Sequence, residues 1–234
     1  GVPYREIALK EDFTVPVEDF LGQKSTVFLA NPNAPTGLFL KVSEIERILQ
    51  ANPENVVVID EAYVDFGGES VIPLIRKYDN LLVTGTFSKS RSLAGGRLGF
   101  GIASSGLIRD LNTMKFSTNP YNVNRMTMAF GVGTLQDEDY VKKNCEEIRK
   151  TRKWVSEKMK DMGFSMTDSK ANFIFARHQK ADGKKIYLGL KEKGVLVRHF
   201  DTPRLSPYNR ITVGSREEME TFLEKLEEVL EDLK

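Results

Sequence analysis

The chain has 234 residues, of which 40% are hydrophobic and 29% are charged, with a formal net charge of +1. This balance is typical of a soluble globular protein and gives no reason to expect nucleic acid or an anionic membrane as a partner. No apolar run approaches the roughly 20 residues that span a bilayer, and the N-terminus has no secretory signal pattern. The single cysteine, Cys145, excludes an internal disulfide and indicates a cytoplasmic protein. One cysteine and two histidines argue against a zinc site, so we expect no metal.

The first part of the chain alternates short apolar runs with helical patterns. Ser43 and Glu46 predict a capping box for a helix whose buried side is Ile45, Ile48 and Leu49. The predicted buried strands are Ser25–Ala30, Val56–Ile59, Leu81–Thr84 and Phe100–Ala103. Strands that alternate with helices indicate a mainly parallel sheet sandwiched by helices, and ligands of such sheets bind where the strands end.

The second part begins with a long charged segment, Asp137–Met162, which predicts a helix that ends at Gly163. A capping box at Ser215 and Glu218 starts the last helix, Ser215–Leu233. Between these helices we expect strand Asn172–Ala176, helix Lys184–Lys193, strand Val195–Arg198 and strand Arg210–Val213. The sequence therefore predicts an α/β domain over residues 1–136, a connecting helix over 137–163 and a smaller α+β domain over 164–234.

Three segments carry chemistry. The stretch from Thr86 to Arg97 reads TFSKSRSLAGGR, and it places the amine of Lys89 among hydroxyls, glycines and a second cation just after an apolar strand. Val56–Tyr63, VVVIDEAY, places the carboxylate of Asp60 at the end of another strand. Asn31–Gly37, NPNAPTG, is a rigid turn after a third strand. All three should meet at the carboxyl edge of the sheet.

In this order the segments resemble the fold-type I pyridoxal-phosphate aminotransferases, and most of all their histidinol-phosphate aminotransferase branch. The resemblance runs from about Val2 to the C-terminus. It implies an incomplete large domain of that fold followed by the small domain. It also implies pyridoxal 5'-phosphate as cofactor, small amino-acid and phosphate substrates, and a homodimer whose subunits share residues at the active sites.

The cofactor's pyridine nitrogen needs a carboxylate that keeps it protonated, and Asp60 is the candidate. Tyr63 is expected to donate to the phenolic oxygen of the cofactor. Lys89 is expected to bind the cofactor aldehyde and then to move a proton, with its pKa depressed by burial and by Arg97. The alternatives are an ordinary solvated or capping aspartate and an ordinary surface lysine.

The phosphate of the cofactor is expected to bind Thr86, Ser88 and Arg97, because hydroxyls and a guanidinium form strong hydrogen bonds with a dianion. Gly95 and Gly96 would let the backbone turn close to it. The family carries an asparagine directly before Pro-Thr-Gly, where this chain has Ala34. Asn33 could replace it, although adjacent side chains rarely point the same way.

Substrate binding is expected in the smaller domain. The resemblance implies that Arg210 binds the substrate α-carboxylate, a bidentate role that lysine performs poorly. Arg198 would face the distal end of the substrate and its phosphate, and Asn172 would lie near the substrate. A strand-end arginine paired with a surface carboxylate is the alternative for Arg198, and a turn residue is the alternative for Asn172.

Members of the family carry roughly one further small unit before the region that matches Val2. That unit holds a glycine-rich phosphate-binding turn and an aromatic residue that stacks on the pyridine ring. We therefore expect a truncated chain that binds cofactor weakly or lacks turnover by itself. Two alternatives to the aminotransferase remain: an enzyme similar to threonine-phosphate decarboxylase, and a non-catalytic module or fragment with the aminotransferase fold.

Overall fold

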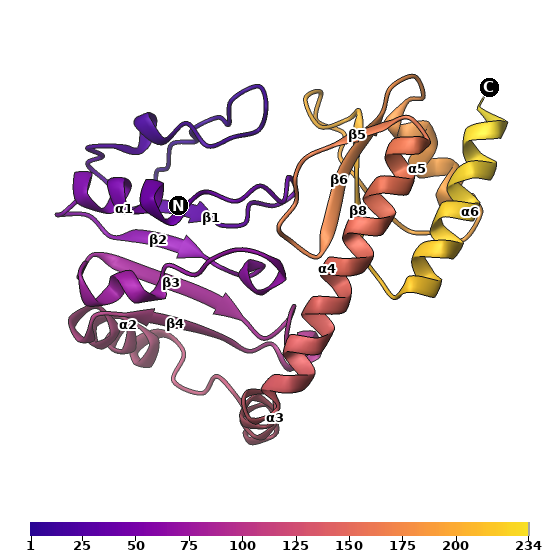
Figure 1. Ribbon diagram of the computed structural model, residues 1–234. Coiled ribbons are helices and arrows are strands. Elements are labelled where there is room, and N and C mark those ends of the chain that lie inside the picture. Colours follow the sequence, from indigo (N-terminus) through magenta and orange to yellow (C-terminus); the bar gives the residue numbers. More distant parts are fainter. Residues whose placement is uncertain (234) are drawn as a thin grey trace.

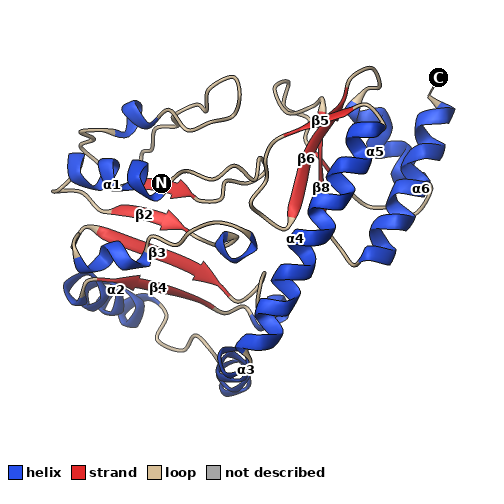
Figure 2. Ribbon diagram, viewed as in Figure 1, coloured by secondary structure: helices blue, strands red, loops and turns tan. Residues whose placement is uncertain are grey.

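The computed structural model describes residues 1–233, which form two sheets joined by a long helix (Figures 1 and 2). The first sheet has the order β1-β2-β3-β4. Its strands are β1 (Val27–Ala30), β2 (Val57–Asp60), β3 (Leu81–Thr86) and β4 (Gly99–Ala103). Strands β1, β2 and β3 are parallel, and β4 is antiparallel to β3. This sheet confirms the predicted α/β class.

The core of the first domain lies between the sheet and helix α1 (Val42–Ala51). Val57 and Leu81 from the sheet and Ile48 from α1 are completely buried. Each such side chain stabilises the fold by about 1.5–3 kcal/mol relative to exposure. The remaining connections contain short 3-10 helices at Val17–Phe20, Val64–Phe66, Ile72–Arg76 and Ala94–Gly96.

The N-cap residue of helix α1 is Lys41, two residues before the predicted cap, Ser43. The backbone N–H of Lys41 donates to Glu44 Oε2 at 3.4 Å. Glu46 instead accepts from Lys77 Nζ and from the Tyr78 hydroxyl, at 2.6 and 2.8 Å. The predicted Ser43–Glu46 box is therefore wrong, because Glu46 serves a tertiary contact.

Strand β4 differs from the predicted buried strand in orientation and burial. It runs antiparallel to β3 and pairs with no other strand of the described chain, and Phe100 is 41% exposed. The Phe100 ring lies over Gly85 of β3, where an added Cβ would sit 2.3 Å from the ring. The apolar composition of β4 therefore reflects packing across one strand pair and not coverage on both faces.

Two helices that the pattern did not predict follow β4: α2 (Ser105–Thr118) and α3 (Arg125–Gln136). No residue of α2 is buried, and α3 buries only Thr127 and Gly131. A helix is recognised in sequence by one continuous apolar face. Neither helix has such a face turned to a core, so the sequence lacks the apolar period that would indicate a helix there.

Helix α4 (Glu138–Asp161) runs from the first sheet to the second (Figure 1). Asp137 caps it by accepting from the Tyr140 N–H at 3.3 Å, and Gly163 follows its end with φ +88°. Near its start, Val141 and Cys145 pack with Phe66, whereas Val155 and Met159 belong to the core of the second sheet. The helix therefore holds the two sheets in one arrangement. The domain limits 1–136 and 164–234 stay an interpretation.

The second sheet is antiparallel, with the order β5-β6-β8-β7. Its elements are β5 (Phe164–Met166), β6 (Phe173–His178), α5 (Gly183–Glu192), β7 (Arg198–His199), β8 (Tyr208–Thr212) and α6 (Arg216–Asp232). Helices α4, α5 and α6 cover one of its faces (Figure 2). The Ser215–Glu218 capping box of α6 is present as predicted.

The predicted strand Val195–Arg198 is mostly absent. Gly194, at φ +83°, ends α5, and the Val195 N–H donates back to the Leu190 carbonyl at 2.8 Å. Only Arg198 and the next residue join the sheet. Across residues 1–233, no helix combines the length and the apolar character needed to cross a membrane.

Candidate active site

Strands β1 and β2 end level with one another, and β3 extends two residues further, to Thr86. Ala30 pairs with Asp60, and Asp60 pairs with Thr84. The turns that follow the strands therefore meet at the carboxyl edge of the sheet, as expected. Asn31–Gly37, Asp60–Tyr63 and Thr86–Lys89 all begin there.

Asp60 is the last residue of β2, and its side chain is exposed. Its Oδ1 accepts from the Ala62 N–H at 3.0 Å. This contact fixes the carboxylate within the turn and leaves its second oxygen available. Tyr63 follows in the same turn and is half-buried, with its ring edge-to-face on Phe173 at 5.1 Å between centroids.

Lys89 is exposed, so the predicted burial of its amine is wrong. Burial at the end of a strand depends on what covers that end, and the covering segments are not encoded in the local motif. The Lys89 Nζ lies 5.4 Å from the centre of the Tyr63 ring. The Asp60 turn and the Lys89 turn are therefore in contact through Tyr63.

A line of cations and aromatic rings continues from Lys89 into the second domain. The Tyr63 ring contacts Phe173 of β6, and the Arg210 guanidinium lies 5.1 Å from the centre of the Phe173 ring. Arg210 Nε is buried and has no hydrogen-bond partner among the described residues. An unpaired buried donor is costly unless a ligand satisfies it, so Arg210 is suited to bind an anion.

Phe173 is the residue of this line that the sequence pattern did not single out. It is 2% exposed and joins the two predicted parts of the site. The sequence feature that could have indicated Phe173 is its position at the start of the Phe-Ile-Phe run, next to Asn172. The run reads equally well as ordinary core, which is why its link to Tyr63 could not be inferred.

The hydroxyl loop after β3 is held by its own hydrogen bonds. Thr86 Oγ1 accepts from the Ser88 N–H at 3.1 Å and lies 3.4 Å from the Leu98 carbonyl oxygen, to which it donates. Arg97 is exposed, and its backbone is in the left-handed region at φ 52°. Its Nη1 donates to the Ala94 carbonyl at 3.1 Å. Thr86, Ser88 and Arg97 thus belong to one closed loop, because Thr86 pairs with Gly99 just beyond Arg97.

The Asn31–Gly37 turn contacts the second domain. The Lys170 N–H donates to the Gly37 carbonyl at 2.8 Å, and the Thr167 hydroxyl donates to the Thr36 carbonyl. Gly37 has φ +71°, and a Cβ there would lie 2.1 Å from Ser169 Oγ. Asn33 Oδ1 accepts from the Thr36 hydroxyl at 2.8 Å. The side-chain amide nitrogen of Asn33 is therefore the group left for a ligand.

The remaining two candidate residues lie on or beside the second sheet. Arg198 is directly paired with Arg210 across β7 and β8, so both side chains lie on the same face. Arg198 is exposed, with its guanidinium 5.5 Å from the Phe200 ring centre. Asn172 is half-buried, and its carbonyl accepts from the Val213 N–H at 2.9 Å.

Glu61, next to Asp60, is a buried carboxylate. It accepts from the Val71 N–H at 2.7 Å and from the Ser70 hydroxyl at 2.6 Å. Burial raises the pKa of Glu61 above its usual value, against the effect of these two hydrogen bonds. Glu61 therefore fastens the loop that follows Tyr63.

Glu61→Gln should change how stability depends on pH. Because the folded-state pKa of Glu61 is raised, the unfolded chain loses this proton first, and Glu61 makes stability fall as pH rises above about 4.5. The variant should lack this fall, so that the free energy of unfolding relative to wild type increases with pH in that window. Urea unfolding at several pH values checks it, and a constant difference would contradict it.

Among residues 1–233, no three His, Cys, Asp or Glu residues cluster as metal ligands would. The chain matches the family model described as aminotransferase class I and II over residues 1–226. This chain belongs to the aminotransferase class I and II family.

Named relatives refine the comparison. The chain is 45% identical over 228 residues to a histidinol-phosphate aminotransferase of Brachyspira hyodysenteriae, covering 97% of this chain and 64% of that protein. The chain thus spans slightly less than two thirds of the length of the curated relatives it matches. Among solved structures, the histidinol-phosphate aminotransferase of Clostridium acetobutylicum has a TM-score of 0.88 at 25% identity, covering 96% of this chain and 70% of that one.

Two further solved structures are similar to the chain. One is histidinol-phosphate aminotransferase from Sinorhizobium meliloti in complex with pyridoxal-5'-phosphate, with a TM-score of 0.80 at 26% identity, covering 89% of this chain and 58% of that one. The other is L-threonine-O-3-phosphate decarboxylase from Porphyromonas gingivalis, with a TM-score of 0.74 at 26% identity, covering 88% of this chain and 65% of that one.

Proposed function

We propose that this chain carries the catalytic residues of a pyridoxal-phosphate-dependent histidinol-phosphate aminotransferase of histidine biosynthesis. The reaction is L-histidinol phosphate plus 2-oxoglutarate giving imidazole-acetol phosphate plus glutamate. The observation that carries the proposal is the line from the Lys89 amine through Tyr63 and Phe173 to Arg210. In this line an amine able to bind an aldehyde and a guanidinium able to bind an acid group lie on either side of a shared aromatic surface.

The residues at the sheet edge fit pyridoxal phosphate. The chemistry of the donor set matches each part of the cofactor: a free amine for the aldehyde, a carboxylate for the pyridine nitrogen, and hydroxyls with a guanidinium for the phosphate. Lys89, Asp60, Thr86, Ser88 and Arg97 supply these groups. The Tyr63 hydroxyl and the amide nitrogen of Asn33 would donate hydrogen bonds to the phenolic oxygen of the cofactor.

When bound, the cofactor would withdraw electrons from the substrate α-carbon and so make its proton acidic. Lys89 would take up this proton at Nζ and deliver it to the carbon of the cofactor's aldehyde group, since its flexible stem lets Nζ move between the two carbons. Asp60 keeps the pyridine nitrogen protonated. The half-buried Tyr63 places its ring beside the Lys89 amine.

Arg210 would bind the α-carboxylate of glutamate, and Arg198, on the same face, would reach the phosphate of histidinol phosphate. Asn172 lies directly before β6, next to Phe173. Two guanidiniums on one face suit histidinol phosphate and glutamate in turn, because both substrates present anions. The assay is glutamate formation from L-histidinol phosphate and 2-oxoglutarate with added pyridoxal phosphate. Turnover of L-histidinol phosphate by the cofactor-bound protein without formation of glutamate would rule out this function.

Arg210→Lys should raise KM for 2-oxoglutarate by about 10- to 100-fold, the range expected for losing a hydrogen bond to a charged group. Lysine keeps the charge but cannot donate through a planar fork. Arg216→Lys is the control, since Arg216 pairs with Glu220 on α6, away from the sheet edge. Steady-state kinetics measure both variants, and an unchanged KM in Arg210→Lys would contradict the assignment.

A second function, decarboxylation of O-phospho-threonine, is favoured by the similarity to the Porphyromonas gingivalis enzyme. Both reactions start from a phosphorylated amine bound to the same cofactor. Product analysis separates them, because the decarboxylase releases carbon dioxide and the aminotransferase forms glutamate. Formation of carbon dioxide without glutamate would establish the second function.

We also propose a cytoplasmic homodimer. The apolar side chains of α3 support the assembly, since Met126, Phe130 and Leu135 are 67%, 55% and 52% exposed. Exposed apolar side chains gathered on one element often mark a protein interface. The free, buried Cys145 is compatible with a reducing compartment.

A further inference from the structure

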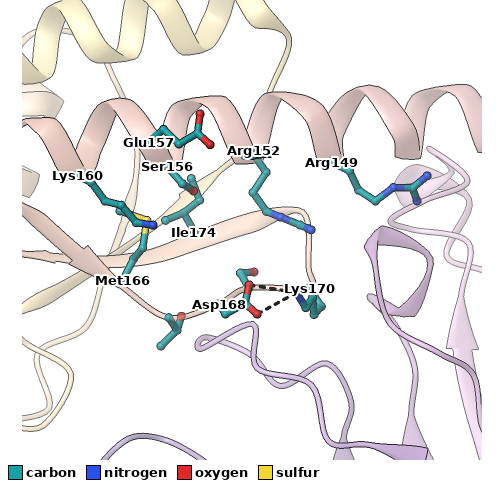
Figure 3. A pocket seen from close by; sticks show the side chains of 12 residues that line it. Arg149, Arg152, Ser156, Glu157, Lys160, Met166, Asp168, Lys170 and Ile174 are labelled. Atoms are coloured by element: carbon teal, nitrogen blue, oxygen red, sulfur yellow. Dashed lines mark hydrogen bonds and ion pairs between the residues drawn. The ribbon is translucent and has the colours of Figure 1, made fainter.

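A pocket of about 570 Å³ lies between α4 and the β5–β6 segment, away from the Lys89 turn (Figure 3). Its charged lining is strongly unbalanced. The basic residues are Arg149, Arg152, Lys153, Lys160 and Lys170, and the acidic residues are Glu157 and Asp168. This volume lies within the range of small-molecule sites.

The basic side chains form a row because of their spacing. Arg149, Arg152 and Lys153 are three and four residues apart, so they share one face of α4. At 1.5 Å per residue, the row extends about 6 Å from Arg149 to Lys153 and about 16 Å to Lys160. Lys170 approaches from the opposite wall (Figure 3). An elongated ligand would therefore meet more cations than a compact one.

Most of these cations have no carboxylate partner. Lys170 pairs with Asp168 at 2.9 Å. The ion pairs found in residues 1–233 include none from Arg149, Arg152, Lys153 or Lys160. Positive charge in the pocket is therefore largely uncompensated.

Two arginines are also held in place. Arg152 Nη1 donates to the carbonyls of Phe66 and Ala171, and Arg149 Nη1 donates to the Asp65 carbonyl at 3.2 Å. Carbonyl partners orient a guanidinium without neutralising it. Fixed guanidiniums lose less freedom when they bind an anion than mobile ones do.

We propose that this pocket binds a small molecule with two or more linked phosphates, such as an inorganic or organic di- or triphosphate. Arginine and lysine side chains are the usual protein donors to phosphate oxygens. A chain of linked phosphates can contact more cations along the row than a single phosphate can. The proposal is independent of the aminotransferase function, since none of its residues belongs to the Lys89 site.

Isothermal titration calorimetry of the whole chain with orthophosphate, pyrophosphate and tripolyphosphate tests this proposal. Affinity should increase with phosphate number. Lys153→Ala should weaken tripolyphosphate binding about tenfold, the effect of losing one charged hydrogen bond. Asp168→Asn should strengthen it, because the substitution removes an opposing charge and releases Lys170. Lys158→Ala on the same helix, outside the pocket, should change affinity less than about twofold.

A second phosphate-binding site is the main confounder, and Arg97→Ala controls for it. Binding should persist in Arg97→Ala, because Arg97 belongs to the hydroxyl loop after β3. The proposal is overturned if no saturable binding occurs, if Lys153→Ala and Lys158→Ala weaken binding equally, or if only Arg97→Ala removes it. Circular dichroism verifies that each variant is folded.

Discussion

Lys89→Arg is expected to abolish covalent cofactor binding. It should also lower turnover by about 10²- to 10⁴-fold, the range for losing a positioned acid–base group. Arginine keeps the positive charge beside Tyr63, but a guanidinium remains protonated and does not attack an aldehyde. The visible absorbance of the cofactor-bound protein and kcat for glutamate formation measure the two effects.

Lys77→Arg is the matched control for this substitution. Lys77 is also an exposed lysine, and it pairs with Glu46 far from the carboxyl edge of the sheet. Its variant should retain the absorbance and the turnover of the wild type. If Lys89→Arg behaved like Lys77→Arg, another amine would have to bind the cofactor.

Asp60→Asn is expected to lower kcat by about 10²- to 10³-fold, as for the loss of one preorganised electrostatic partner in an active site. Asparagine keeps an oxygen that can accept from the Ala62 N–H, so the turn is preserved while the charge is lost. Without that charge the pyridine nitrogen is less protonated and withdraws fewer electrons. Steady-state kinetics at saturating cofactor measure the decrease.

Asp12→Asn provides a close geometric control. Asp12 Oδ1 accepts from the Thr14 N–H at 2.9 Å, the same contact two residues along the chain that Asp60 makes with Ala62. Asp12 lies in an exposed turn of the N-terminal segment. Its variant should leave kcat unchanged, and a comparable decrease in both variants would indicate a general effect of losing a turn carboxylate.

The strands that carry the site could be predicted because an apolar run by itself indicates a buried strand. Val57 and Leu81 lie in continuous apolar runs, and such runs form strands covered on both faces. The polar residue that follows each run then falls at the carboxyl edge. Asp60 and the Thr86 loop were located in this way, by local pattern alone.

The exposure of Lys89 and the role of Phe173 could not be predicted by that route. Both depend on how the second domain sits against the first, and this is set by α4 and by the contacts of the Asn31–Gly37 turn. The pairing of Arg198 with Arg210 depends on strand register, which neither local sequence specifies. Helices α2 and α3 were missed because they turn few side chains to a core.

The most direct test of the central claim is borohydride reduction of the protein with pyridoxal phosphate, followed by peptide mapping. Reduction makes the bond between amine and aldehyde permanent, so even weak cofactor binding leaves a label, and turnover is not required. The label should be on Lys89, in the peptide that contains Thr86-Phe87-Ser88. A stoichiometric label on any other lysine, with Lys89 unmodified, would contradict the account.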